Sequence, residues 1–215
     1  MGFFYLLAEI LILPSLLLSV NRILPHPLSE SVLNPLFFLI NFLCIVGIFH
    51  RFLLESIRQL RTLFRKCLYS AFLAFIGYEA VSYLLGMGIR AMYPDFANLN
   101  DAAFHTMAAE HFILLNLSTV LLVPVAEECL FRGLFFQGLY EKNHILAYGV
   151  STVLFSMVHL MGFIGTCDSI TLLLCLLQYV PAGLALAWAY DRSGTIIAPM
   201  LMHMTVNQLG ILSMR

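Results

Sequence analysis

Two adjacent carboxylates and one guanidinium interrupt a very apolar stretch of this chain. Glu127, Glu128 and Arg132 stand in the segment that begins at Pro124 and continues through three phenylalanines. A charged side chain at the centre of a bilayer costs about 2.5–3.5 kcal/mol, so such residues normally face a helix-bundle interior or a wet cavity. A buried glutamate can act as a general base toward water. Taken alone, the stretch also fits a structural ion pair between helices.

Two further pairs of polar or aromatic residues with i, i+4 spacing lie in apolar surroundings downstream. The first pair is Phe155 and His159, and the second is His203 and Asn207. Histidine and asparagine can donate hydrogen bonds to an oxyanion that forms when water attacks a carbonyl group. The alternative for each residue separately is an interhelical hydrogen bond without catalytic meaning.

The composition places these residues in a membrane protein. Of the 215 residues 61% are hydrophobic and 11% are charged, and the mean hydropathy is +0.92. Soluble domains carry about 25% charged residues. The net charge of −1 and the lack of a basic block exclude a nucleic-acid partner. The five cysteines form no C-x-x-C pair, which argues against a disulfide framework or a thiolate zinc site.

The apolar runs predict an all-α, polytopic membrane protein with about seven transmembrane helices and the polar site in the bundle core. The chain is predicted to be one transmembrane domain, 1–215, with no separate soluble domain. Five of its eleven basic residues fall within residues 51–66, so this connection is predicted to be a cytoplasmic loop. The next connection, residues 90–110, is predicted to be a loop outside. The predicted helices are residues 3–20, 36–54, 68–89, 111–140, 145–160, 171–190 and 195–212.

Depth and helical phase bring the polar residues together. At about 1.5 Å per residue, Glu127, His159, His203 and Asn207 lie roughly 12–21 Å from the cytoplasmic ends of their helices. Four unrelated structural residues would not need to share one layer. Glu128 and the arginine four residues later lie on one helix face and can pair, which leaves Glu127 free to face the other helices. Phe155 lies one turn from His159 and can orient its ring.

The ordered set of motifs resembles the CAAX protease and bacteriocin-processing family of intramembrane endopeptidases. The motifs are E-E-x-x-x-R, F-x-x-x-H and H-x-x-x-N, and they fall in the C-terminal half. The resemblance implies a catalytic core over residues 111–212 and a peptide bond as the substrate group. It implies that Glu127 activates the attacking water and that His159 positions it. His203 and Asn207 would stabilise the oxyanion, while Glu128, Arg132 and Phe155 would support the site.

The resemblance also leaves a metal-dependent version open. A zinc ion could be held by Glu127, His159 and His203 with one open position. The chain has no H-E-x-x-H helix, and a histidine that donates a proton serves the site as well as one that binds metal. We therefore favour a mechanism without a cofactor.

Two other kinds of protein fit part of the pattern. A non-catalytic immunity or scaffold member of the family would have no reason to keep all four polar residues together. A proton-coupled transporter would use a similar glutamate–histidine chain, but the chain shows no inverted repeat or paired broken helices. The expected partners are a membrane protein or peptide substrate and the lipid bilayer. The expected location is a bacterial inner membrane.

Overall fold

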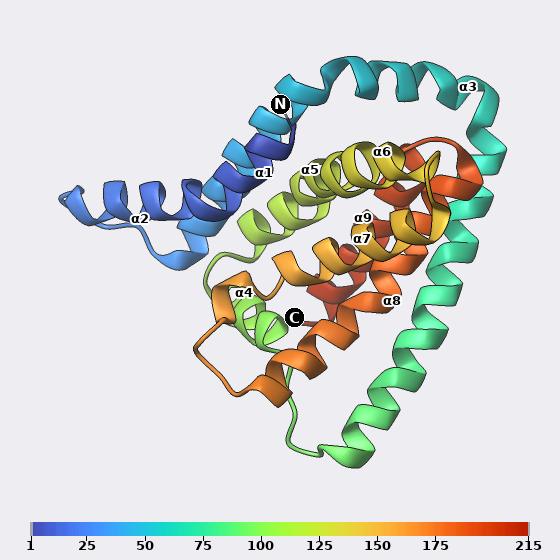
Figure 1. Ribbon diagram of the computed structural model, residues 1–215. Coiled ribbons are helices and arrows are strands. Elements are labelled where there is room, and N and C mark those ends of the chain that lie inside the picture. The colour runs from blue at the N-terminus through green and yellow to red at the C-terminus, as the bar shows by residue number, and fades with distance from the viewer. Residues whose placement is uncertain (1, 215) are drawn as a thin grey trace.

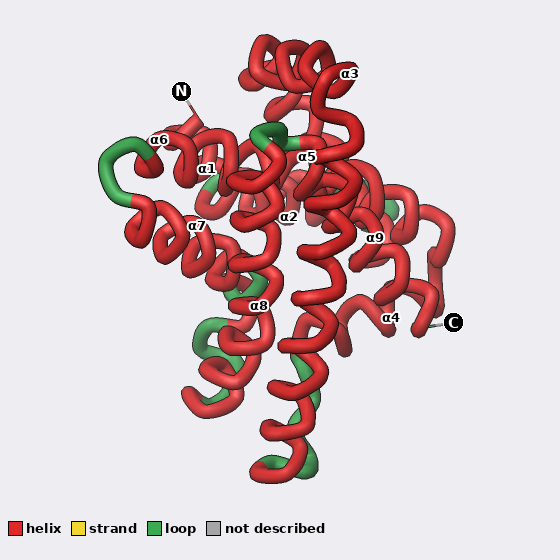
Figure 2. The backbone as a smooth tube through the Cα atoms, turned by 90° about the vertical axis from the view of Figure 1, so that its right-hand side faces the viewer, coloured by secondary structure: helices red, strands yellow, loops and turns green. Residues whose placement is uncertain are grey.

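The computed structural model describes residues 2–214, and every regular element among them is helical. Figures 1 and 2 show a bundle of helices joined by short connections. The predicted all-α fold is confirmed. In chain order the elements are α1 (Gly2–Leu11), α2 (Leu13–Ile23), α3 (Glu30–Met92), α4 (Leu99–Leu117), the π-helix η1 (Ser118–Leu122), α5 (Val123–Glu128), the π-helix η2 (Cys129–Phe136), α6 (Gln137–Tyr140), α7 (His144–Val158), the 3₁₀ turn η3 (Met161–Phe163), α8 (Ser169–Ser193) and α9 (Ile197–Ser213).

The helix α3 replaces two predicted helices and the loop between them. It runs without a break for 63 residues, a length of roughly 95 Å at 1.5 Å per residue, which is about three times the hydrocarbon thickness. Figure 1 shows how α3 fits: it rises along the N-terminal helices, crosses the top of the molecule and descends on the far side. The predicted loop at residues 51–66 is therefore wrong, because this basic stretch continues the helix.

The number of spans also differs from the prediction. By length and apolar composition, three described helices could cross a membrane, or four if the bent pair α1–α2 forms one span. The predicted count of seven is not confirmed. Helix α3 counts as one candidate span, although its two halves were predicted as separate spans. Helices α7 and α9 have 15 and 17 residues and are too short to be counted. The first predicted helix, 3–20, is bent by 42° between α1 and α2, and Pro14 lies in the first turn of α2.

The segment that carries the glutamate pair begins earlier than predicted. Leu99 to Tyr140 forms one stretch of 42 helical residues, so much of the predicted loop 90–110 is helix. Asn98 caps its start, since its Oδ1 accepts hydrogen bonds from the backbone N–H groups of Asn100 and Asp101 at 2.9 and 3.3 Å. The predicted start at His111 coincides with a kink, where φ is −137° and ψ is 61°.

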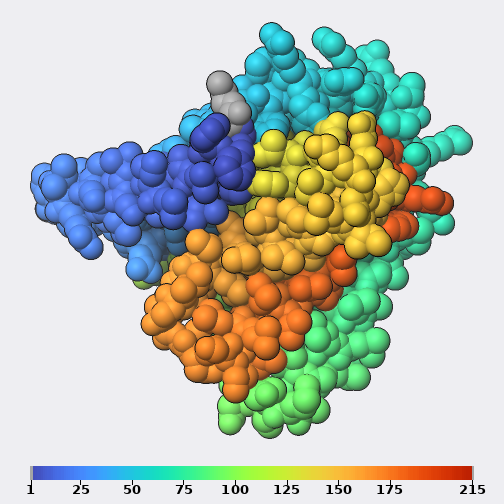
Figure 3. Space-filling model, viewed as in Figure 1, coloured from blue at the N-terminus to red at the C-terminus, as the bar shows by residue number. Residues whose placement is uncertain are grey.

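The last three helices lie within a few residues of their predicted ranges and form the core with α3. One buried cluster joins them through Cys67, Phe155, Leu186 and Met202, and Phe131 of η2 packs into the same cluster. Gly183 permits the close approach of α7 and α8, because a Cβ atom there would lie 2.8 Å from Cγ2 of Thr152. In Figure 3 the N-terminal helices project from one side of this body. The motif-bearing helices therefore form the packed centre of the fold.

Candidate active site

The predicted pair of Glu128 and Arg132 is present and fully buried. Arg132 donates from one terminal nitrogen to Oε1 of Glu128 at 3.1 Å, and both side chains have 0% exposure. Its other terminal nitrogen donates to the carbonyl oxygen of Gly183 at 2.9 Å. The guanidinium carbon lies 4.8 Å from the ring centroid of Phe155. These partners compensate both terminal nitrogens of the buried arginine, although its Nε has no hydrogen-bond partner among the described residues. The same contacts tie the glutamate-bearing helix to α7 and α8.

The glutamate pair lies between two π-helical segments. The short helix α5, which ends at Glu128, follows η1 and precedes η2 directly. A π-helix contains more residues per turn than an α-helix and occurs frequently at functional sites. The uniform α-helical phase that the sequence analysis assumed for this span is therefore wrong, although the i, i+4 pair survives across the change. The irregular winding sets which faces the two carboxylates point to.

His203 lies between the two glutamates. Its Nδ1 is 2.9 Å from Oε1 of Glu128, and its Nε2 is 3.9 Å from Oε2 of Glu127. The Glu128 carboxylate, which also pairs with a cation, can only accept, so the proton lies on Nδ1 of His203. In the neutral ring Nε2 then carries the lone pair. Each ring nitrogen of His203 thus faces one carboxylate oxygen.

Asn207 lies one turn beyond His203 on α9, as predicted. Its Nδ2 donates to the backbone carbonyl oxygen of Thr119 in η1 at 2.9 Å. This bond occupies one of the two N–H groups of the amide, so the second N–H remains for another acceptor. The amide is thereby held by the π-helical backbone, in an orientation fixed before any substrate binds.

His159 lies at the end of α7 and its ring is held on three sides. Nδ1 is 2.8 Å from the carbonyl oxygen of Phe155 and donates to it, which leaves the lone pair on Nε2. The ring stacks on Tyr179 with centroids 4.3 Å apart, and it lies 4.8 Å from the Phe155 ring. The expected role of Phe155 in packing against His159 is thus matched by a direct contact. The same phenylalanine also contacts His203, at 5.7 Å.

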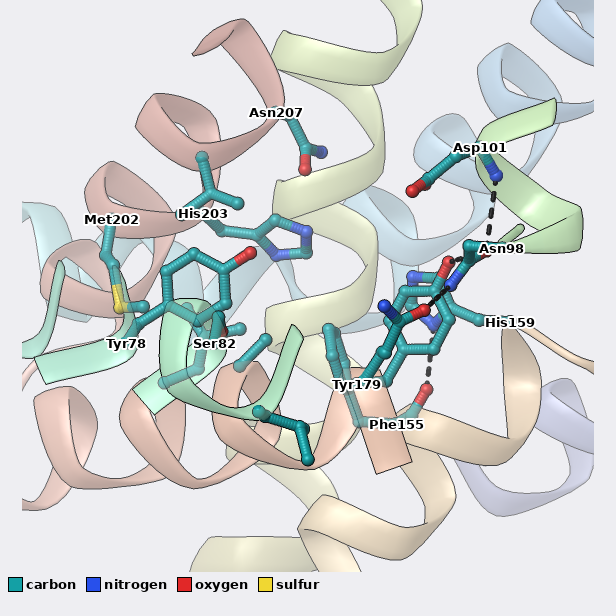
Figure 4. A pocket seen from close by; sticks show the side chains of 15 residues that line it. Tyr78, Ser82, Asn98, Asp101, Phe155, His159, Tyr179, Met202, His203 and Asn207 are labelled. Carbon is teal, nitrogen blue, oxygen red and sulfur yellow. Dashed lines mark hydrogen bonds between the residues drawn. The ribbon is translucent and has the colours of Figure 1, made fainter. Parts of the chain in front are cut away.

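A cavity of about 190 Å³ brings three of the four predicted catalytic residues to one space. Figure 4 shows His203 and Asn207 on one side of it and His159 with Tyr179 on the other. Glu127 does not line this cavity. It lies next to His203, which does line the cavity. Oε2 of Glu127 is buried without a hydrogen-bond partner among the described residues.

The sequence analysis missed the polar residues that form the rest of the cavity wall. They come from α3, from the start of α4 and from α8, which carry no recognisable motif. An asparagine directly before a helix is a familiar N-cap signal and could have marked Asn98. The missed polar residues are Tyr78, Ser82, Asn98, Asp101, Gln178 and Tyr179.

The side chains as arranged do not fit a zinc ion. No group of three or more His, Cys, Asp or Glu side chains within residues 2–214 could hold a metal ion. Glu127 and His203 lie near each other, but the nitrogen that His159 could offer lies on a ring held against Phe155 and Tyr179. The predicted ligand set of Glu127, His159 and His203 is therefore not assembled in this structure.

Comparison with known proteins finds a family match in the C-terminal half. Residues 109–209 match the family model "Type II CAAX prenyl endopeptidase Rce1-like". The chain is 31% identical over 90 residues to "UPF0177 protein YxdF" of Lactococcus lactis subsp. lactis (strain IL1403), a match that covers 42% of this chain and 44% of that protein. It is 32% identical over 90 residues to "Putative membrane peptidase YdiL" of Bacillus subtilis (strain 168), over 41% of this chain and 32% of that protein.

These matches cover less than half of either curated relative. No solved structure matches the chain. The resemblance to the CAAX protease and bacteriocin-processing family is nevertheless confirmed for the region that carries all three motifs. Together with the apolar helices, it identifies an integral, multi-pass membrane protein.

Proposed function

Because residues 109–209 match the Rce1-like family model, we propose that this protein is an intramembrane endopeptidase. It hydrolyses a peptide bond of a membrane-associated protein or peptide with a water molecule that Glu127 activates. No metal or other cofactor takes part in this proposal. The relative named as a membrane peptidase supports the reaction class, and the arrangement of the four polar side chains supports the roles given below.

In the proposed reaction, the water oxygen attacks the carbonyl carbon of the substrate while a water proton passes to Glu127. The carbonyl π electrons move to the oxygen, which becomes an oxyanion. Asn207 donates its free N–H to this oxyanion, and His203 donates from Nε2 when its ring carries both protons. Collapse of the tetrahedral intermediate breaks the carbon–nitrogen bond, and the proton on the glutamate passes to the leaving amine. The lone pair on Nε2 of His159 accepts a hydrogen bond from the water before attack.

The observation that carries the proposal is the unpaired oxygen of Glu127. Oε2 is buried without a partner and lies 3.9 Å from Nε2 of His203. A buried polar atom without a partner costs about 1–3 kcal/mol. Oε2 of Glu128 is also without a hydrogen-bond partner, but Oε1 of that carboxylate pairs with both Arg132 and His203, whereas no ion pair at hydrogen-bond distance holds Glu127 among the described residues. A carboxylate left open beside a histidine, next to a cavity with further hydrogen-bonding groups, favours a catalytic role over a structural one.

The experiment compares Glu127→Gln with the wild-type protein in proteoliposomes. The substrate is a library of membrane-inserting peptides, and mass spectrometry identifies the cut bonds. Glu127→Gln keeps the shape and removes the base, so cleavage should disappear while thermal stability stays close to wild type. Glu141→Gln makes the same change at an exposed turn and should cleave as wild type does. Equal cleavage by the two variants would remove Glu127 from the mechanism.

Absence of cleavage by the wild-type protein, in proteoliposomes that retain folded protein, would instead support the non-catalytic scaffold function.

The proposal also includes the membrane in which the protein and its substrate are found. A bacterial inner membrane is the proposed location, since both curated relatives come from bacteria. A comparison of the membrane proteome with and without the protein would identify the substrate.

A further inference from the structure

The cavity beside His203 and Asn207 has a second polar wall that the proposed reaction does not use. Figure 4 shows Asn98 and Asp101, at the start of α4, across the cavity from Asn207. Gln178 from α8 completes this wall. These residues come from elements outside the three motifs and meet only in the folded protein.

Asp101 offers the cavity a carboxylate that interacts electrostatically with His105 and His159 but has no lysine or arginine partner among the described residues. In Figure 4 its carboxylate points into the space that Asn207 faces. The carboxylate accepts no hydrogen bond among the described residues, although the backbone N–H of Asp101 is capped by Asn98. An acidic residue in the first turn of a helix is stabilised by the helix dipole. This effect explains why an aspartate is found at this position, but it does not explain why the carboxylate points into the cavity. No lysine or arginine is among the residues that line the cavity.

The neighbouring amides are arranged around this carboxylate. Asn98 donates from Nδ2 to Oε1 of Gln178 at 2.7 Å, and its own Oδ1 is occupied as the cap of α4. Both N–H groups of the Gln178 amide are therefore left without a described acceptor and can bind a peptide carbonyl group. The wall thus offers one carboxylate and one amide donor.

The cavity is too small for a whole ligand. Binding pockets for drug-sized molecules measure about 300–1,000 Å³, whereas this cavity measures about 190 Å³. Its size suits one amino-acid side chain. Asp101 itself is exposed, so a polypeptide that reaches the site from outside the bundle can meet it directly.

We propose that the side of this cavity formed by Asn98, Asp101 and Gln178 is a specificity subsite for a basic side chain, lysine or arginine, close to the scissile bond of the substrate, with Asp101 as its counter-charge. This inference rests on the proposed endopeptidase function and adds the class of substrate to it. Because Asp101 is exposed, solvent screens its ion pair with the substrate. Such a pair should change the cleavage rate by about fivefold.

The test measures which residues flank the bonds that are cut in a randomised library of membrane-inserting peptides. The wild-type protein should favour lysine and arginine over norleucine and methionine at one position by about fivefold in kcat/KM. Asp101→Asn should bring this ratio close to one, and Asp101→Lys should make the site prefer glutamate and aspartate at the same position. Asp95→Asn removes an exposed charge just before α4, away from the cavity, and should keep the wild-type ratio.

Cleavage without a basic preference, or with the same preference in Asp101→Asn, would overturn the subsite and leave the endopeptidase standing. A second measurement does not depend on hydrolysis: binding of lysine-containing peptides and their norleucine analogues to Glu127→Gln protein, with and without Asp101→Asn. If the wild type cleaves nothing, the proposed function fails and this binding difference alone decides whether the subsite exists. Equal binding of the two peptide series would then overturn it.

Discussion

Nδ1 of His203 lies 2.9 Å from Oε1 of Glu128. The second glutamate of the pair therefore holds a histidine as well as an arginine, and it fixes which nitrogen of the ring carries the proton. This contact links α5 to α9 across 75 residues of sequence. It also means that any change to Glu128 or its partners alters the orientation of His203 and not only the packing of the helix.

Arg132→Ala should destabilise the protein strongly. It strands Glu128 as a buried charge without its cation, at a cost of about 3–5 kcal/mol, and it removes the bond to the Gly183 carbonyl. Thermal denaturation in detergent should show a clear loss of melting temperature. Arg58→Ala, which removes an exposed arginine from α3, should leave the melting temperature nearly unchanged. An Arg132→Ala protein as stable as the wild type would show that Glu128 does not need its arginine partner in the folded state.

Asn207→Ala should lower turnover by roughly 10²–10³ with little change in KM, because an oxyanion donor acts in the transition state. The neighbouring Gln208 provides the control. Gln208 follows Asn207 on α9 and donates to Asn116 of α4 at 3.3 Å, so Gln208→Ala removes an amide of similar size from outside the cavity lining and should retain turnover. If both variants lost activity equally, the anchoring of α9, and not donation to the oxyanion, would explain the loss.

Gly183→Ala should destabilise the contact between α7 and α8. The added methyl group would meet Cγ2 of Thr152 at 2.8 Å and its Cα at 3.1 Å, and overpacking of this kind costs about 1–3 kcal/mol. Gly149→Ala is the matched control, since a Cβ at that position in α7 meets nothing within 4 Å and a helical alanine is favoured over glycine. Thr152→Ser should rescue Gly183→Ala only in part, because the backbone contact remains. Full rescue would show that the close approach involves the side chain alone.

Exhaustive chelation should leave the proposed peptidase active. In the proposed mechanism Glu127, His159 and His203 act without a metal ion. Within the described residues these three side chains are not assembled as a ligand set. Elemental analysis of active, detergent-purified protein should find no stoichiometric zinc. One zinc per chain that is lost together with activity in His159→Ala would establish the metal-dependent mechanism instead, while the endopeptidase function would remain.

The sequence by itself determined the class of the protein and the residues of its three motifs. Apolar composition and the lengths of the apolar runs predict a helical membrane protein, because a bilayer requires every backbone polar group to be paired and a helix of about 20 apolar residues achieves this within its own segment. Local spacing was sufficient for Glu128 with Arg132 and for Phe155 with His159, since residues four apart on a helix are neighbours whatever the rest of the fold does.

Only the tertiary structure decided how those pairs meet. The contact of His203 with Glu128 and the bond from Asn207 to the Thr119 carbonyl join distant segments, and no local pattern encodes such distances. The same holds for Asp101 and Gln178, which become part of the cavity only when α4 and α8 pack beside α9. The sequence analysis missed the continuity of α3 because the basic, exposed stretch at residues 51–66 has the composition of a loop. The stretch is helical because it continues from apolar helical segments on both sides, which pack against the rest of the protein.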